Sequence, residues 1–110
     1  MAAYSEITIE QGATFSSTVT VEDVYGTAVN LTNHTASSMM RKSYHSTTAT
    51  TITANVTGTA NGEITISITA ANTANITAGR YVYDLIIRDN ANTVTRVIEG
   101  IATVLPSVTR

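Results

Sequence analysis

The sequence has no cysteine and no tryptophan, and only one lysine and one proline among its 110 residues. Without cysteine, neither a disulfide framework nor a thiolate metal site is possible. Charged residues make up 13% of the chain, and the formal net charge is -2. No basic cluster of the kind that neutralises phosphate groups is present, so we expect no nucleic-acid partner.

Long apolar runs are also missing. The first ten residues, MAAYSEITIE, contain no basic region, and Glu6 interrupts their apolar residues. We therefore expect no signal peptide, no transmembrane span and no membrane partner. A protein of this kind that acts outside a cell would leave by lysis, by an unusual route or as part of a longer parent.

Threonine is the residue that the chain has in excess, at 22 of 110 positions. Its β-branched side chain fits the half-exposed surface of a sheet, whereas the helix-favouring residues glutamate, lysine and leucine are scarce. The composition therefore predicts an all-β protein. The length fits one domain over residues 1–110, with residues 106–110 as a short tail after the last strand.

Apolar and polar residues alternate along short segments that glycine and asparagine separate. This pattern predicts seven or eight antiparallel strands packed as a two-sheet sandwich. Residues 70–79 lack the period of two, so we expect one helical turn there, with Ile76 under the sheet and Gly79 at its end. In the last strand, Gly100 predicts a bulge or a close backbone approach, and the facing of that strand is ambiguous.

The stretch AGRYVYDL, residues 78–85, refines the expected fold. A tyrosine that follows a tight corner and begins the penultimate strand resembles the tyrosine corner of immunoglobulin-like sandwiches. We expect the Tyr81 hydroxyl to bond to the backbone of the preceding ANITAG corner. Tyr83 takes the place of the second cysteine of antibody domains, so the prediction is an immunoglobulin-like sandwich that is not an antibody domain.

The segment GRYVYDLIIRD, residues 79–89, carries apolar residues on both faces of its predicted strand. The inward residues are Tyr81, Tyr83, Leu85 and Ile87. Val82 and Ile86 point outward among charged residues, and an apolar centre with a charged rim is typical of protein interfaces. The predicted interface residues are Met39, Arg41, Val82, Asp84, Ile86 and Arg88. The alternative is that these are ordinary exposed residues of a strand.

No constellation for catalysis or metal binding is visible. His34 and His45 flank a strand, and Ser43 and Ser46 lie near them in the sequence, but a nucleophile elbow and a buried orienting acid are missing. We interpret both histidines as solvated loop residues. Acidic residues at 22–23 and 89 fit turns better than a calcium loop. We therefore predict no catalytic residue, no metal ligand and no cofactor.

Four segments of the chain resemble small structural proteins of tailed bacteriophages, especially marine ones. They are QGATFSSTVTVEDVYGTAVNLT, MMRKSYHS, AGRYVYDLII and RVIEGIATVLPSVTR, at residues 11–32, 39–46, 78–87 and 96–110. The chain is more distantly similar to the immunoglobulin-like N-terminal domain of phage upper-baseplate proteins. The resemblance implies a non-enzymatic virion component that is assembled in the host cytoplasm. Its implied partners are other virion proteins, with further copies of itself included, on the head, neck, tail or baseplate.

Two other classes of protein stay open. One is a cell-surface or secreted adhesion module, which the Asn-x-Thr sequons at Asn30, Asn33, Asn55 and Asn75 would favour. A chain this rich in threonine and asparagine also produces such sequons by chance. The other class is an enzyme, against which the missing acid, base and nucleophile argue.

Overall fold

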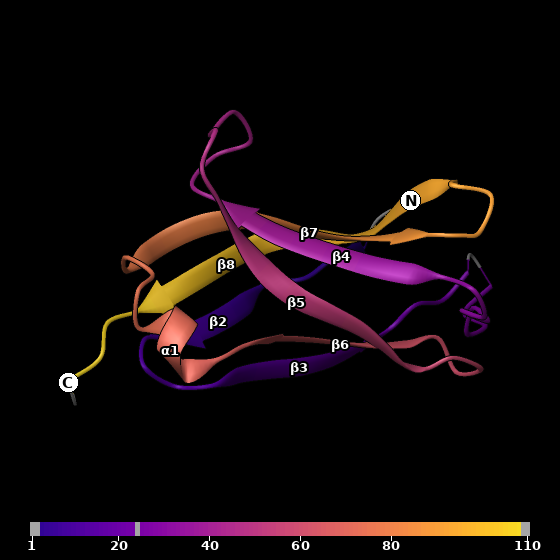
Figure 1. Ribbon diagram of the computed structural model, residues 1–110, viewed down its shortest axis with the longest axis horizontal. Helices are drawn as coiled ribbons and strands as arrows, with labels where there is room; N and C mark the ends of the chain where they lie inside the picture. Colours follow the sequence, from indigo (N-terminus) through magenta and orange to yellow (C-terminus); the bar gives the residue numbers. More distant parts are fainter. Residues whose placement is uncertain (1–2, 24, 109–110) are drawn as a thin grey trace.

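The computed structural model describes residues 3–23 and 25–108, which form eight β-strands and one short helix (Figure 1). In chain order these elements are β1 (Ala3–Tyr4), β2 (Ile7–Glu10), β3 (Phe15–Thr20), β4 (Thr35–Arg41), β5 (Ala49–Gly58), β6 (Glu63–Ile68), α1 (Ala70–Thr73), β7 (Gly79–Arg88) and β8 (Val94–Leu105). The predicted all-β class is confirmed, and so is the helical turn.

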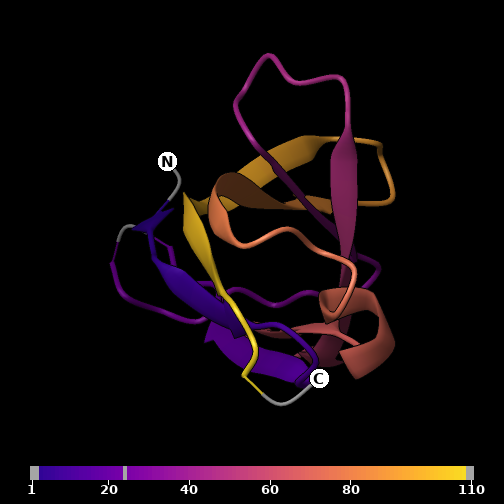
Figure 2. The same ribbon diagram turned by 90° about the vertical axis from the view of Figure 1, so that its left-hand side faces the viewer.

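All eight strands belong to one sheet, with the order β1-β8-β7-β4-β5-β6-β3 and with β2 also paired to β8. β5 joins the two halves, because Ala49–Ile52 pair with β4 whereas Thr53–Gly58 pair with β6. Viewed along the long axis, the sheet curls around its core (Figure 2). The predicted division into two sheets is therefore not confirmed. The expectation of antiparallel strands fails at the N-terminus, where β1 and β2 run parallel to β8.

The core is built from apolar residues at alternate positions of the strands, with Leu31 from the segment between β3 and β4. Ile9, Leu31, Met40, Ile52, Ile64, Ile66 and Leu85 are at most 1% exposed. Leu31 follows Ala28, which forms an isolated antiparallel bridge with Glu22. Burial of apolar side chains is the dominant stabilising contribution to a fold of this kind.

The corner between β6 and β7 is held by polar contacts to the backbone. Thr69 caps α1, and the fully buried Thr73 hydroxyl accepts a hydrogen bond from the Gly12 N–H at 3.1 Å and donates one to the Ala13 carbonyl at 2.8 Å. Ile76 is buried, as predicted. The Tyr81 hydroxyl donates to the Thr77 carbonyl at 2.6 Å, so the predicted hydrogen bond from Tyr81 to the backbone of the corner is confirmed.

Gly100 marks a close approach of two backbone segments, as predicted. A Cβ atom at this position would lie 1.9 Å from the Ser5 carbonyl oxygen. The Ser5 N–H donates to the Glu99 carbonyl at 2.9 Å, and its own carbonyl accepts from the Tyr83 hydroxyl at 2.6 Å. Only glycine leaves room for the chain to cross here between β1 and β2.

Candidate interaction face

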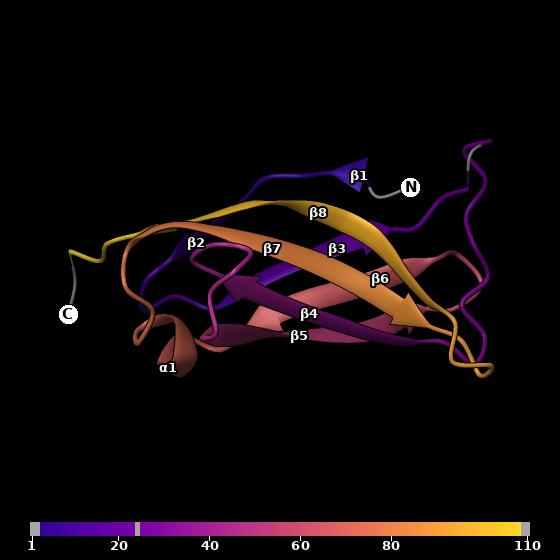
Figure 3. The ribbon, with the colours of Figure 1, turned by 90° about the horizontal axis from the view of Figure 1, so that it is seen from above.

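β4, β7 and β8 lie side by side in the sheet (Figure 3). We call the face that their outward residues share the outer face. Its cross-strand rows follow from the register. Moving along the strands, the rows are Arg41–Val82–Ile101, then Met39–Asp84–Glu99, then Ser37–Ile86–Arg96, then Thr35–Arg88–Val94. Two apolar residues of β7 therefore alternate with charged ones on the same face, as the sequence predicted.

An open hollow of about 300 Å³ lies at the centre of the outer face. The predicted interface residues that line it are Met39, Arg41, Val82, Asp84 and Ile86. Val82 and Ile86 are half-buried, and Met39 is 45% exposed. Arg88 does not line the hollow; it is an exposed residue in the last row, opposite Thr35 and Val94.

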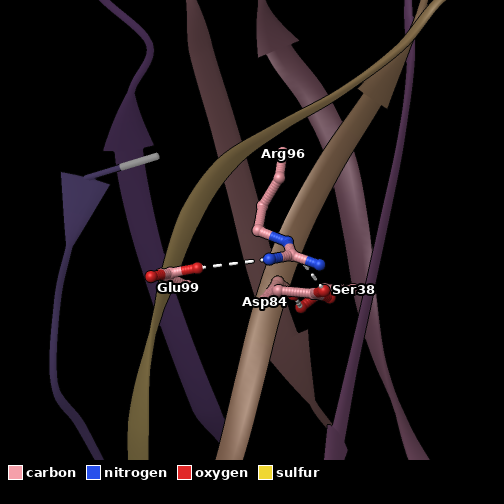
Figure 4. Close-up of polar contacts among 4 residues, drawn as sticks. All are labelled: Ser38, Asp84, Arg96 and Glu99. Carbon is pink, nitrogen blue, oxygen red and sulfur yellow. Dashed lines mark hydrogen bonds and ion pairs between the residues drawn. The ribbon is translucent and has the colours of Figure 1, made fainter. Parts of the chain in front are cut away.

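Arg96 is the central charged residue that sequence reasoning missed (Figure 4). Its Nε lies 3.4 Å from Asp84 Oδ2, and its Nη1 lies 3.3 Å from Glu99 Oε2. Asp84 and Glu99 are direct cross-strand neighbours, which places two negative charges opposite each other. Such pairs are destabilising, so the guanidinium offsets a repulsion that the sheet itself creates.

A β-bulge places Arg96 on the outer face. Leu85 pairs with Ile98 but Ile86 pairs with Arg96, so Val97 is an extra residue in β8. Strict alternation from the buried Ile98 would have pointed Arg96 into the core. The bulge shifts the pattern by one residue, which explains why the facing of this strand was ambiguous from sequence.

Polar contacts fix the edge of the hollow beside β4. The buried Ser38 hydroxyl donates to the Asp84 carbonyl at 2.6 Å. Arg41 Nη1 donates to the Ser46 carbonyl at 2.8 Å and so anchors the loop between β4 and β5. Tyr44 of this loop lines the hollow and is 70% exposed. The hollow thus has aromatic and aliphatic surface between two arginines and two carboxylates.

The two histidines lie beyond opposite ends of β4. His34 Nδ1 lies 3.0 Å from the Thr32 carbonyl oxygen, and His45 is exposed in the β4–β5 loop. This separation prevents them from acting as a pair. Within the described part of the chain, no group of three or more histidine, aspartate and glutamate residues could hold a metal ion.

Asp23 and Asp89 act as turn acceptors, as predicted, whereas Glu22 lies in the isolated bridge to Ala28. Asp23 Oδ1 accepts the N–H groups of Tyr25 and Thr27 at 2.9 and 3.1 Å. Asp89 Oδ1 accepts those of Ala91 and Thr93, both at 2.9 Å. Both carboxylates therefore stabilise their own loops.

Comparison with protein-family models finds no match, and comparison with curated protein sequences finds none either. In residues 3–23 and 25–108, no helix has the length and apolar content that crossing a bilayer requires.

Proposed function

We propose that this protein is a non-enzymatic structural subunit of a bacteriophage particle. In this proposal it binds other virion proteins through the outer face of β4, β7 and β8. Its assembly takes place in the host cytoplasm. The position on the particle is the head, the neck, the tail or the baseplate.

One observation carries the proposal. Half-buried Val82 and Ile86 and the 45% exposed Met39 supply the apolar surface of the outer face. Asp84 lies between the two β7 residues, and Arg41, Arg96 and Glu99 lie beside them. Protein interfaces combine apolar surface with polar and charged groups at their edges. The arginines and the exposed tyrosine Tyr44 belong to the residue types that dominate binding energy at such sites.

The immunoglobulin-like architecture is part of the same proposal. In constant-type immunoglobulin domains one sheet contains strands C, F and G, and the other contains B, E and D. The neighbours β4-β7-β8 and β3-β6-β5 have the corresponding order. The tyrosine corner at Tyr81 adds to the likeness. The continuous β5 is the departure from two separate sheets.

The resemblance of four segments to structural proteins of tailed phages supplies the virion context. A rigid sheet that presents a small interface suits a subunit that is held in place by its neighbours. The competing placement is an adhesion module on a cell surface, and the location of the protein separates the two.

Quantitative mass spectrometry of particles released from cells that carry the gene tests this proposal. We expect the chain in purified particles at a fixed ratio to the major virion proteins. The same measurement on the surface fraction of these cells is the control. Recovery from the cell surface alone, with none in particles, would contradict the proposal.

A further inference from the structure

The sheet does not close where its two ends meet, between β2 and β3. In the described residues, β2 pairs only with β8 and β3 pairs only with β6. The two strands run in opposite directions beside each other (Figure 1), and a groove of about 430 Å³ separates their free edges. We call this groove the seam.

The seam has the chemical character of a site for one more strand. Half-buried Ile7 and Phe15 provide apolar surface facing the core, and Glu6, Glu10 and Ser16 are exposed beside it. An inserted strand would pair antiparallel with one edge and parallel with the other, and its alternate side chains would contact the apolar residues.

The β3 edge lacks the features that usually prevent strand addition. Its residues FSSTVT include no charged residue and no proline, and its register with β6 is continuous over Phe15–Thr20 without a bulge. Natural proteins normally protect free edges with charged residues, proline or bulges, so the β3 edge is open to pairing.

Contacts at one end of the seam fix the loop between β2 and β3. Gln11 Nε2 donates to the Ile76 carbonyl at 2.6 Å, and Gly12 N–H donates to the Thr73 hydroxyl at 3.1 Å. The loop that joins β2 to β3 is thus fixed to the corner around α1. A preformed edge binds a strand at a lower conformational cost than a flexible one.

The charges that line the seam indicate which kind of segment would bind there. Glu6 and Glu10 line the seam, and none of the described residues that line it is positively charged. We propose that the seam binds an extended segment of a partner protein in which β-branched apolar residues alternate with lysine or arginine. The basic side chains would then lie beside Glu6 and Glu10, and opposite charges on neighbouring strands are favourable. Binding of a strand at the seam does not depend on whether the protein is part of a phage particle.

Nuclear magnetic resonance of the full chain tests it with a capped synthetic peptide, KVTVKVT, and its acidic counterpart, EVTVEVT. We expect the basic peptide to shift amide signals of β2 and β3, and the acidic peptide to bind at least tenfold more weakly. The double variant Glu6→Gln/Glu10→Gln should lose at least tenfold in affinity for the basic peptide. Glu22→Gln/Glu63→Gln, which changes the net charge equally outside the seam, should retain it.

Three results would overturn the proposal. One is the absence of shifts in β2 and β3 at millimolar basic peptide. Another is equal binding of the two peptides. The last is equal loss of affinity in both double variants, because the effect would then come from net charge and not from the seam.

Discussion

Asp84 on β7 and Glu99 on β8 face each other directly across the sheet, and Arg96 forms an ion pair with both. Replacing Arg96 by methionine keeps most of its apolar stem but leaves the two carboxylates opposed. The side chains are between 37% and 52% exposed, so we expect a loss of only about 1 kcal/mol in the free energy of unfolding. Urea denaturation checks this value.

A second change controls for simple loss of packing at Arg96. In Arg96→Met combined with Glu99→Gln the repulsion is gone, so stability should recover at least in part, and the defect of the single variant should shrink at high salt. An identical loss in the single and double variants at all salt concentrations would show that repulsion between these carboxylates is not the cause.

The tyrosine corner gives a prediction for Tyr81. Tyr81→Phe removes the hydroxyl that donates to the Thr77 carbonyl but keeps the ring under Lys42 Nζ, which lies 4.8 Å from its centroid. We expect a destabilisation of about 1 kcal/mol, the net value of one hydrogen bond. Chemical denaturation measures it, and a change within error would argue that the corner contributes nothing to stability.

Tyr83 predicts how stability depends on alkaline pH. Burial raises the pKa of its phenol above the ordinary value, and this outweighs the contact with the Ser5 side chain, which lowers it. The folded state therefore holds this proton more tightly than the unfolded state. Its contribution is fully present below about pH 10 and is lost as the pH rises through the raised pKa.

The comparison of wild type with Tyr83→Phe isolates that contribution. The variant loses the hydrogen bond to Ser5, so it should be less stable than wild type at pH 8. The difference between the two should shrink above pH 10 in denaturant titrations. A difference that stays constant or grows in this range would contradict the assignment.

Gly100 predicts a local effect at the N-terminus. Gly100→Ala places a methyl group against the Ser5 carbonyl, and overpacking of this kind costs about 1–3 kcal/mol. We expect Gly100→Ala to raise the hydrogen-exchange rates of β1 and β2 more than those of β6, because the substitution pushes the N-terminal segment away from β8. Uniform or absent changes in exchange would show that the approach is not tight.

Much of this fold could be predicted because the alternation of apolar and polar residues along a strand indicates which side chains are buried. Ile64, Ile66 and Ile68 alternate without interruption, and all three are buried. The tyrosine corner was predictable because its contact is local, between Tyr81 and Thr77. The role of Gly100 as a close approach could be stated from sequence, although its partner Ser5 could not.

The other features of the fold and of the outer face depend on contacts between residues far apart in the sequence, which the alternation pattern does not reveal. The bulge at Val97 reverses the direction in which Arg96 points. The alternation of apolar and polar residues does not reveal where such an extra residue lies. The parallel pairing of β1 and β2 with β8 joins segments from opposite ends of the chain. Five of the six predicted interface residues line the hollow because β4 and β7 align in register, while Arg88 lies beyond it.

The most direct test of the proposed function is incorporation of the variant Met39→Lys into phage particles. Met39 is 45% exposed in the hollow, opposite Asp84, so lysine should leave the isolated domain folded but add a charge that the interface must desolvate. Leu105→Lys is the matched control, because Leu105 is 42% exposed, lies opposite Glu10 and does not line the hollow. We expect folded Met39→Lys to be lost from purified particles while Leu105→Lys is incorporated normally. Normal incorporation of both variants would contradict the assignment of the outer face as the surface that binds other virion proteins.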